Sequence, residues 1–456
     1  MDNTKKNEFL ATEPIGRLLF KLAVPTIAAQ LINMLYNIVD RIYIGHMDGV
    51  GDLALTGVGV CMPLIMIVSA FAALVGSGGA PRASIFMGRG DNESAERTMG
   101  SCFCAQIIIS ALLTAVLLVF GEDLLLAFGA SENTIIYALP YMRIYALGTV
   151  FVELTLGMNS YITAQGFAKE GMLTVVVGAV CNIILDPIFI FLFDMGVSGA
   201  ALATVISQGL SCVWVLAFLM SKKSILRLKP STLKIDTKLL FPCLALGLAP
   251  FIMQSSESVI SVCFNSSLLK YGGDIAVGAM TILTSVMQFA MLPLQGLAQG
   301  AQPITSYNFG AKNTERVKRI FRLLLVSSLV YSMLLWSLIM LFPRAFASVF
   351  TPDAILLDFT EGALRIYCAV LGIFGVQVAC QMTFVSMGKA VSSMIVAIVR
   401  KFVLLLPLIY TVPLFFDAEM KTTAVYLAEP IADVLAVSFT AILFAVQFKR
   451  ALKDLQ

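Results

Sequence analysis

The sequence predicts an all-α integral membrane protein, with twelve transmembrane helices in two six-helix bundles related by a parallel internal repeat. The first observation is composition, since the chain is 59% hydrophobic and 13% charged, with a mean hydropathy of +0.90. Soluble domains contain roughly 45–50% apolar and 25% charged residues. The second observation is a tandem duplication, because a set of residues recurs 222 positions later in the chain.

The duplication consists of identical residues in the same order and at the same spacing. The matched pairs are Gly51/Gly273, Asp52/Asp274, Ala54/Ala276, Gly78/Gly300, Pro81/Pro303, Ser84/Ser306, Gly88/Gly310, Glu93/Glu315, Phe120/Phe342, Phe128/Phe350, Arg143/Arg365, Ile144/Ile366, Tyr145/Tyr367 and Gly166/Gly388. The spacing first changes at Pro187 and Pro407. Many secondary transporters are built from such repeats. A polar residue present in only one half is therefore not part of the shared scaffold.

Each half contains six apolar stretches long enough to cross a hydrocarbon core of about 30 Å as a helix. The stretches of the first half are 18–44, 53–78, 98–120, 138–163, 171–193 and 197–220. Those of the second half are 239–268, 275–299, 320–342, 363–387, 391–415 and 422–447. Twelve spans are expected, six in each half.

An even number of spans in each half makes both halves enter the membrane from the same side, so the repeat is parallel. The cytoplasmic side is expected to carry more Lys and Arg. One side has 23 of these residues, including Lys5 and Lys6, whereas the other has only Arg41, Lys270, Arg344 and Lys421. We therefore expect a multi-pass protein of the cell (inner) membrane with both termini in the cytoplasm. The net charge of +3 then requires no nucleic-acid partner.

The expected domains follow the duplication: residues 1–220 form the N-terminal bundle, 221–238 a cytoplasmic linker and 239–456 the C-terminal bundle. No polar segment is long enough to form a nucleotide-binding domain, and no glycine-rich phosphate loop followed by Lys-Ser/Thr is present. The nine cysteines and the single His46 form no metal-ligand pattern. We expect no enzyme, no cofactor and no metal beyond a coupling ion, which would be H⁺ or Na⁺.

Polar groups inside the spans are the candidate functional residues, because they are costly in hydrocarbon. The first span carries a polar stripe on one helical face, made of Gln30, Asn33, Asn37 and Asp40. The fifth span carries Asn182 and Asp186, one helical turn apart. Counting along the helices places Asp40 and Asp186 at similar depth, toward the outer side.

The duplication indicates that this carboxylate pair is functional. The second half has Val262, Phe402 and Leu406 at the positions equivalent to Asp40, Asn182 and Asp186. Two nearby carboxylates in a low dielectric can share a proton or bind a cation through oxygen ligands. Thr204 in the sixth span could complete the oxygen shell. The alternatives are that Asp40 only caps its span beside Arg41, and that Asn182 and Thr204 only bond to neighbouring helices.

Further ionisable residues lie in the remaining spans, namely Glu153, Glu257, Arg400, Lys401, Glu429 and Asp433. Glu257 lies in an unusually polar run, and its first-half counterpart is Leu35. The acidic residues either face a cavity or pair with Arg143, Arg365, Arg400 or Lys401. Arg400 is either a cavity cation or extends to the cytoplasmic surface.

Three sequence features together resemble the multidrug and toxic compound extrusion (MATE) transporters over essentially the whole chain. They are the run Asn182-Ile183-Ile184-Leu185-Asp186-Pro187, the combination of Pro25 with Asp40, and the Gly-Ala-Pro and Gly-Ala-Gln-Pro segments of the second and eighth spans. The resemblance implies export of cationic or amphipathic organic compounds in exchange for H⁺ or Na⁺, through a V-shaped cavity between the bundles.

The resemblance also implies that cation coupling involves Asp40, Asn182, Asp186 and Thr204, the pattern of the prokaryotic branch with an N-lobe site. Members that couple through the C-terminal bundle pair a span 7 acid with an Asp in span 10. Val376, Gln377 and Gln381 occupy that stretch here, so a complete site of that kind is not expected. The candidate substrate-cavity residues are Asn33, Tyr36, Asn37, Glu153, Glu257 and Gln381.

Pro25 removes a backbone hydrogen bond from the first span and is the candidate conformational residue. The expected partners are organic cations or amphipathic drugs and membrane lipid, with the protein acting as a monomer. The alternative function is a flippase for a lipid-linked precursor, which would need several cavity cations for a pyrophosphate group. A hydrolase or a channel is less consistent with the sequence, because no nucleophile–base set and no repeated filter segment is present.

Overall fold

The computed structural model describes residues 8–47 and 49–455, so Lys5 and Lys6 of the expected cytoplasmic charges lie outside the described residues. Within these ranges the chain consists of helices joined by short loops, without strands. Ten helices are long and apolar enough to span a membrane. This result agrees with the all-α membrane class predicted from composition.

The first bundle is formed by six consecutive spans, joined by short connections. They are α2 (Ile15–Gly45), α3 (Gly51–Gly88), α4 (Asn92–Ala127), α5 (Glu132–Ala164), α6 (Ala168–Pro187) with the π-helix Ile188–Leu192, and α7 (Gly196–Met220). The π-helix begins directly after Pro187, which lacks a backbone donor. The short helix α1 (Glu8–Thr12) precedes α2.

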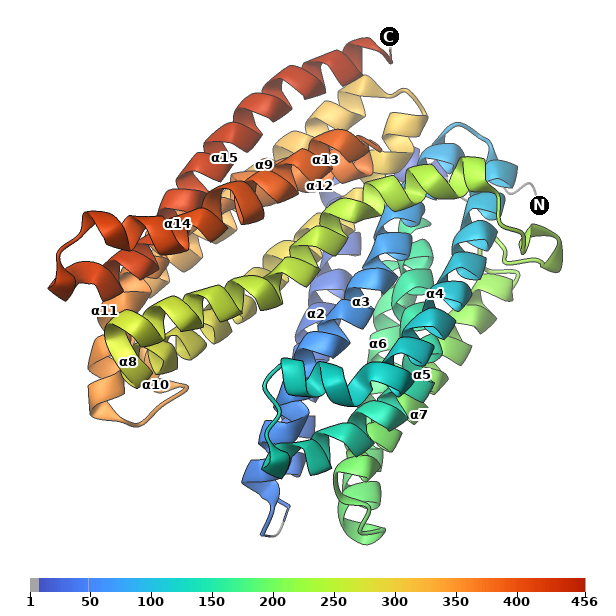
Figure 1. Cartoon of the computed structure of the whole chain (residues 1–456). Helices are drawn as coiled ribbons and strands as arrows, with labels where there is room; N and C mark the ends of the chain where they lie inside the picture. The colour runs from blue at the N-terminus through green and yellow to red at the C-terminus, as the bar shows by residue number, and fades with distance from the viewer. Residues whose placement is uncertain (1–7, 48, 456) are drawn as a thin grey trace.

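The second bundle begins with α8 (Thr237–Gly310), a run of 74 residues. A straight helix of that length would measure about 110 Å, several times the hydrocarbon thickness. Gly273 interrupts it, with φ 65° and ψ −162°, and Figure 1 shows the chain reversing there. We call residues 237–272 the first limb of α8 and residues 274–310 its second limb.

The remaining spans of the second bundle are more broken than their counterparts. They are α9 (Thr314–Leu341) with the short α10 (Pro343–Ser348), α11 (Ala354–Tyr367) with α12 (Phe374–Ser386), α13 (Ala390–Ile398) with the π-helix Val399–Leu405 and α14 (Leu406–Thr411), and α15 (Lys421–Lys453). α11 and α12 form one span bent by 44°. Since α8 contributes two spans, the described residues contain the twelve predicted spans.

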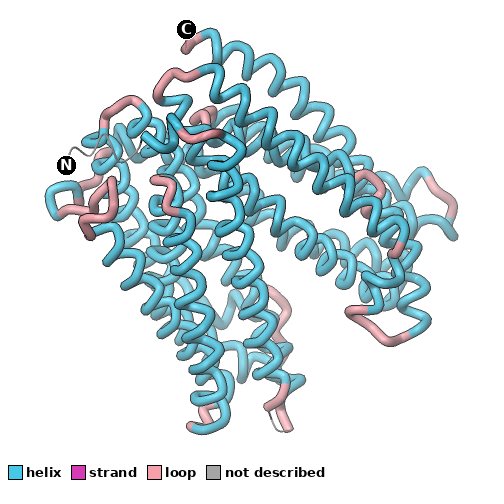
Figure 2. The backbone as a smooth tube through the Cα atoms, turned by 180° about the vertical axis from the view of Figure 1, so that it is seen from behind, coloured by secondary structure: helices cyan, strands magenta, loops and turns pink. Residues whose placement is uncertain are grey.

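The two bundles meet at one end of the molecule and diverge at the other, which gives the molecule the shape of a V (Figures 1 and 2). The last turns of α15 and the helix α1 lie where the bundles meet, and we call this the terminal end. The opposite end is called the far end. Large apolar side chains on the outer surfaces, such as Val119 at 70% exposure and Leu112 at 62%, are suited to contact lipid.

Repeated glycines form the seam, by which we mean the contact of α2 and α3 with α8 near the terminal end. A Cβ atom on Gly88 would lie 2.0 Å from the carbonyl oxygen of Tyr307, and one on Gly310 would lie 2.0 Å from that of Ile85. These two contacts are equivalent under the duplication. The other glycines in close backbone contact across the seam are Gly78, Gly247, Gly296 and Gly300. The repeated glycines of the sequence thus let the two bundles approach closely.

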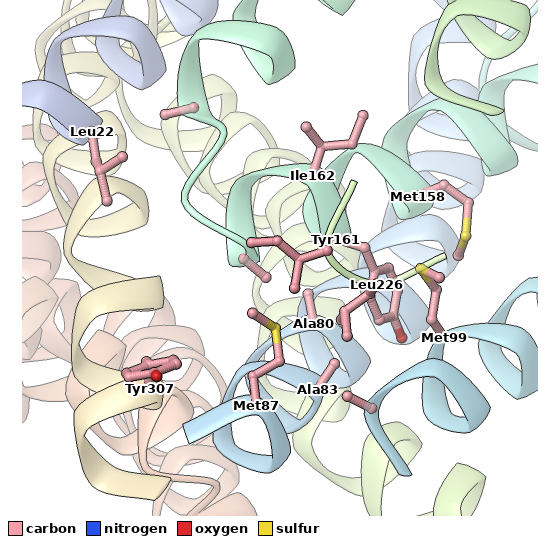
Figure 3. Close-up of a cluster of buried hydrophobic side chains, with 14 of the residues drawn as sticks. Leu22, Ala80, Ala83, Met87, Met99, Met158, Tyr161, Ile162, Leu226 and Tyr307 are labelled. Carbon is pink, nitrogen blue, oxygen red and sulfur yellow. The ribbon is translucent and has the colours of Figure 1, made fainter. Parts of the chain in front are cut away.

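Apolar packing continues across the seam. Leu22 of α2 and Tyr307 of α8 belong to the same buried cluster as Met87, Met99 and Tyr161 of the first bundle (Figure 3). The side chain of Thr26 also reaches across, with Oγ1 2.6 Å from the carbonyl oxygen of Gly296. The terminal end is therefore closed by continuous packing.

The segment between the bundles is held against the first bundle. Oε1 of Gln165 accepts hydrogen bonds from the backbone N–H groups of Ile225 and Leu226, both 2.8 Å long. Glu96 accepts from the backbone of Arg227 and forms an ion pair with Lys229. This segment is packed rather than freely extended.

Candidate functional site

The structure places Asp40 of α2 and Asp186 of α6 side by side in the first bundle, where their carboxylates interact directly. Asn182, one turn before Asp186, donates from Nδ2 to Asp186 Oδ1 at 3.1 Å. Asp186 is fully buried and Asn182 is 1% exposed. The alternative in which Asp40 forms an ion pair with Arg41 is not observed within the described residues.

This group has oxygen atoms available for a ligand. Buried Oδ1 of Asp40, Oδ2 of Asp186 and Oδ1 of Asn182 have no hydrogen-bond partner among the described residues. Unpaired buried oxygens are costly unless they bind a proton, a cation or water. The site can therefore accept a positively charged ligand without first breaking a strong internal bond to these atoms.

A small polar cavity with a volume of about 40 Å³ adjoins the site. Its polar lining comes from Asn33, Tyr36, Thr155, Thr174, Asn182, Thr204, Ser207, Gln208 and Ser211. Each water needs roughly 10–15 Å³ of such volume, so the cavity is large enough for a few waters or a partly hydrated ion. Thr204 and Asn182 both line it, which places the four predicted coupling residues in one region.

The predicted residues of the first-span stripe have different environments. Asn33 and Tyr36 line the cavity, whereas Asn37 is partly buried and donates to the carbonyl oxygen of Asn33 at 2.6 Å. Gln30 bonds instead to Gln299 across the seam, at 3.1 Å. The stripe thus extends from the seam to the carboxylate pair.

Glu153 does not line the cavity described above, and its assignment as a substrate-cavity residue stays a prediction. Its side chain is fully buried in the first bundle, and both carboxylate oxygens lack a hydrogen-bond partner among the described residues. It also forms no ion pair with Arg143 there. On α5 the cavity is lined by Thr155 and Leu156.

The sequence analysis missed several cavity residues on α7. Thr204, Ser207, Gln208 and Ser211 all line the cavity and are spaced as one face of a helix. This polar stripe in an otherwise apolar span was a detectable signal, comparable to the stripe of the first span. Only Thr204 was selected from it.

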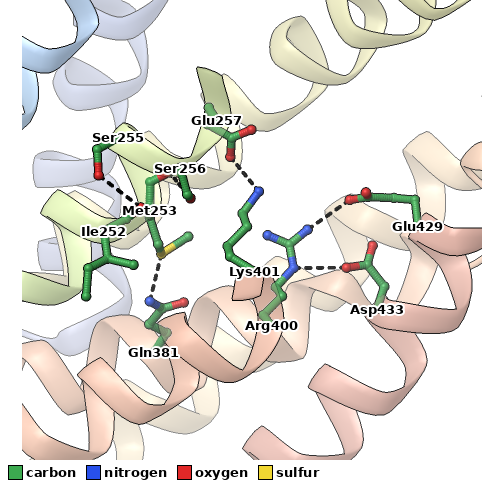
Figure 4. A network of polar contacts seen from close by, with 10 residues as sticks. All are labelled: Ile252, Met253, Ser255, Ser256, Glu257, Gln381, Arg400, Lys401, Glu429 and Asp433. Carbon is green, nitrogen blue, oxygen red and sulfur yellow. Dashed lines mark hydrogen bonds and ion pairs between the residues drawn. The ribbon is translucent and has the colours of Figure 1, made fainter. Parts of the chain in front are cut away.

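A second polar cluster lies in the second bundle, and we call it the C-bundle cluster (Figure 4). Arg400 donates from Nε to Asp433 Oδ1 at 3.0 Å and from Nη2 to Glu429 Oε1 at 3.2 Å. Lys401 donates from Nζ to Glu257 Oε1 at 2.6 Å. The sequence left open whether Arg400 extends to the surface or pairs with carboxylates, and the structure shows that it pairs.

Gln381, the remaining substrate-cavity candidate, lies beside this cluster on α12 (Figure 4). Its Nε2 atom contacts the sulfur of Met253 at 2.8 Å, and its side chain is largely buried. Glu257 on the first limb of α8 is different, because 52% of its side chain is exposed. Glu257 is thus the accessible acid of the C-bundle cluster.

Comparison with models of known protein families assigns the chain to a family. The model of the MatE family matches residues 25–188 and matches again over residues 250–411. The chain belongs to the MATE transporter family. The two matches fall in the two halves, so the duplication seen in the sequence is one MATE unit present twice. As a member of a transporter family, the chain is not an enzyme.

Curated relatives and solved structures agree with this assignment. The chain is 22% identical to the multidrug export protein MepA of Staphylococcus aureus (strain NCTC 8325 / PS 47), over 94% of each protein. It is 23% identical to MepA of Staphylococcus haemolyticus (strain JCSC1435), over 92% of each. A MATE structure in a bent conformation superposes with a TM-score of 0.91 at 22% identity, covering 100% of this chain and 99% of that one.

An outward-facing multidrug resistance MATE transporter superposes equally well, with a TM-score of 0.91 at 22% identity and full coverage of both chains. These structural likenesses establish the shared fold of two six-helix bundles. The apolar helices and the family membership make the chain a multi-pass membrane protein. The carboxylate pair belongs to the first MATE unit only, because the second unit has apolar residues at the equivalent positions.

Proposed function

We propose that this protein is a cation-coupled antiporter that exports cationic or amphipathic organic compounds by alternating access. The observation that carries the proposal is the contact of Asp40 with Asp186 in one bundle only. Duplication would have preserved both copies of a purely structural pair. A carboxylate pair that is buried in a membrane protein and present in only one of its two repeats is a functional site by default.

The carboxylate pair is proposed to bind the coupling ion, either H⁺ or Na⁺. Unpaired oxygens of Asp40, Asp186 and Asn182 are available, and Thr204 lines the adjoining cavity. Two close carboxylates cannot both remain charged at low cost, so a proton or a cation that neutralises one stabilises the pair. Na⁺ would find carboxylate, amide and hydroxyl oxygens there.

The V shape supports an assignment of membrane orientation. The basic loops, the helix α1 and the last turns of α15 lie where the bundles meet, and positive charge favours the cytoplasmic side. The terminal end would then be cytoplasmic and closed, with the far end open to the outside of the cell membrane. Each chain contains both bundles, so it would work as a single chain.

The proposed cargo is inferred from the acidic residues of this chain and from the function of its relatives. The curated relatives above are multidrug export proteins, and the accessible acid Glu257 suits positively charged compounds. A flippase for a pyrophosphate lipid would require free cations facing the cargo. Arg400 and Lys401 are instead buried and paired with carboxylates, which favours the exporter.

Equilibrium binding of an organic cation across pH and Na⁺ series tests the proposal. If cargo and ion compete, H⁺ or Na⁺ weakens cargo binding by the same factor by which the cargo weakens ion binding. Affinity that is indifferent to both ions contradicts ion-coupled export. Binding of anionic lipid-linked compounds without binding of cations would replace the exporter with the flippase.

A further inference from the structure

A short segment before the first span contacts both bundles at the terminal end. We call residues 8–14, which comprise α1 and the two residues that join it to α2, the arm. The chain connects the arm directly to the first bundle. A Cβ atom on Gly166, between α5 and α6, would lie 2.5 Å from Cζ of Phe9 and 3.3 Å from Cδ2 of Leu10. The arm therefore also packs closely on the first bundle.

The carbonyl groups of the arm are bound by the second bundle. The Leu10 oxygen accepts from Nδ2 of Asn308 at 2.9 Å and from Nη2 of Arg316 at 3.2 Å. The same Nη2 atom donates to the carbonyl oxygen of Glu13 at 2.9 Å. Nε of Arg316 donates to Oδ1 of Asn308 at 3.1 Å, which orients the two side chains. Cationic side chains commonly bind the free carbonyls at the end of a helix.

These contacts are the main partners of Arg316. Among the described residues no carboxylate forms an ion pair with it. Leu10 adds apolar packing, because it is fully buried in the same cluster as Ile304 of α8 and Ile320 of α9. The arm is thus held to the second bundle by charge-assisted hydrogen bonds and by a buried side chain.

The duplication separates these contacts from the shared scaffold. Gly166 recurs as Gly388, but the first-half positions equivalent to Asn308 and Arg316 are Phe86 and Ser94. The pair that binds the arm is therefore present in the second unit only. The same reasoning that distinguishes the carboxylate pair of the first bundle indicates a specific role for Asn308 and Arg316.

We propose that the arm is a strap that holds the terminal end closed and must leave Asn308 and Arg316 before the two bundles can separate there. Because the arm is joined to α2, moving the second bundle away from α2 breaks the hydrogen bonds to Leu10 and Glu13. The strap stabilises the closed state alone, so its strength sets how often the seam opens. The inference rests on the proposed alternating access, which requires this opening.

Maleimide labelling of Cys243 in the purified full-length protein tests the strap. Cys243 lies at the seam and is fully buried, so its thiol reacts only while the bundles are apart. With a slowly reacting maleimide, the labelling rate is proportional to the open fraction. We expect Arg316→Gln to raise this rate at least about tenfold, because one hydrogen bond from a charged group changes an equilibrium constant by roughly that factor. Peptide mass spectrometry assigns the label.

Lys318→Gln is the matched control, because Lys318 is a cation of the same helix that pairs with Glu315 rather than with the arm. Its labelling rate should equal that of the unmodified protein. Cys61 and Cys368 are 0% and 1% exposed inside the first and second bundle, respectively. They should stay unlabelled in every variant, which shows that each variant is folded.

Phe9→Ala weakens the contact of the arm with Gly166 and should also speed the labelling of Cys243. It decides the question alone if Arg316→Gln does not fold. The double variant should label little faster than either single one, because both changes release the same segment. Folded single variants that label at the unmodified rate, or additive effects in the double variant, overturn the inference. The measured rate itself shows that the seam opens, so either result leaves the proposed alternating access standing.

Discussion

Asp186 is the residue on which the proposed coupling mechanism depends most. Its side chain is fully buried, has one amide donor in Asn182 and lies against a second acid in Asp40. Such a group in hydrocarbon is stabilised by binding positive charge. Exchange of that charge for cargo is the proposed chemistry of the first bundle.

Replacement of Asp186 by Asn keeps shape and hydrogen-bonding capacity but removes the exchangeable charge. We expect efflux of a cationic dye to fall to the vesicle background, and Asp40→Asn to fail in the same way. The double variant should be little worse than either single one, because the two acids act as a unit. Efflux assays on matched amounts of inserted protein compare the transport rates of the single and double variants.

Asp52→Asn provides the control for this series, since Asp52 recurs as Asp274 and belongs to the scaffold. Its efflux should remain near that of the unmodified protein. Additive losses in the Asp40/Asp186 series would show that the two acids act separately.

At the scale of single elements, α2 connects the carboxylate pair to the seam. Asp40 lies near one end of the helix, whereas Ala23 and Ile27 pack against glycines of α8 near the other. Pro25 lies beside these seam residues and removes one backbone hydrogen bond. A change of charge at Asp40 can thus be transmitted to the seam by bending of α2.

Pro25→Ala should slow transport more than it weakens cargo binding, because it stiffens α2 without touching the site. Turnover and equilibrium binding, measured on the same preparation, separate the two effects. Pro63→Ala, in the interior of α3, is the control helix proline and should have a smaller effect on turnover. A loss of cargo affinity without a loss of turnover would mean that the bend of α2 at Pro25 does not change during transport.

Helix capping is also preserved by the duplication. Asp91 caps α4 by accepting from the backbone of Ser94, and Asn313, 222 positions later, caps α9 by accepting from Arg316. The hydrogen bonds from Ser94 hold the pKa of Asp91 below its usual value. A carboxylate of this kind stabilises the fold above its unfolded-state pKa, and this contribution is lost as pH falls through the lowered value.

Asp91→Ala should destabilise the protein by about 1 kcal/mol, the usual cost of a lost cap. Asp91→Asn should cost much less at neutral pH, because Asn performs the same task at position 313. Thermal unfolding in detergent at several pH values measures both. The difference between the unmodified protein and the Ala variant should shrink in acid; a difference independent of pH would contradict the account.

Features set by local or repeating sequence signals could be predicted from the sequence, whereas contacts between residues far apart in the chain could not. Composition and the 222-residue period are local or repetitive signals, and they were sufficient for the twelve spans. Depth along a helix brought Asp40 and Asp186 together, but depth alone does not define the helical face on which a buried acid such as Glu153 lies. The pairing within the C-bundle cluster joins three distant spans through Glu257, Arg400 and Glu429, and no spacing rule predicts it.

On the scale of the whole molecule, the proposed alternating access requires the seam to open at the terminal end. Cys102 of α4 and Cys243 of α8 come from different bundles, both are fully buried, and their thiols interact directly. Gly78 and Gly79 of α3 lie against the Cys243 carbonyl and the Cys102 sulfur. This pair reports whether the two bundles separate.

Oxidative cross-linking of Cys102 to Cys243 with copper phenanthroline should stop transport, and a reductant should restore it. The cross-link ties the bundles together where alternating access needs them to part. Cys243→Ser protein should be insensitive to the oxidant, which controls for the other cysteines. Full transport by protein shown by mass spectrometry to be cross-linked would mean that the seam stays closed throughout the cycle.

The most direct measurement of the central claim is efflux of a cationic dye from vesicles under separately imposed pH and Na⁺ gradients. We expect the unmodified protein to move dye against its gradient when at least one of the two ion gradients is present, and to stop when both are collapsed. Asp186→Asn protein should not respond to either gradient. Dye movement that continues without any ion gradient, or a normal response in Asp186→Asn, would contradict coupling through the carboxylate pair.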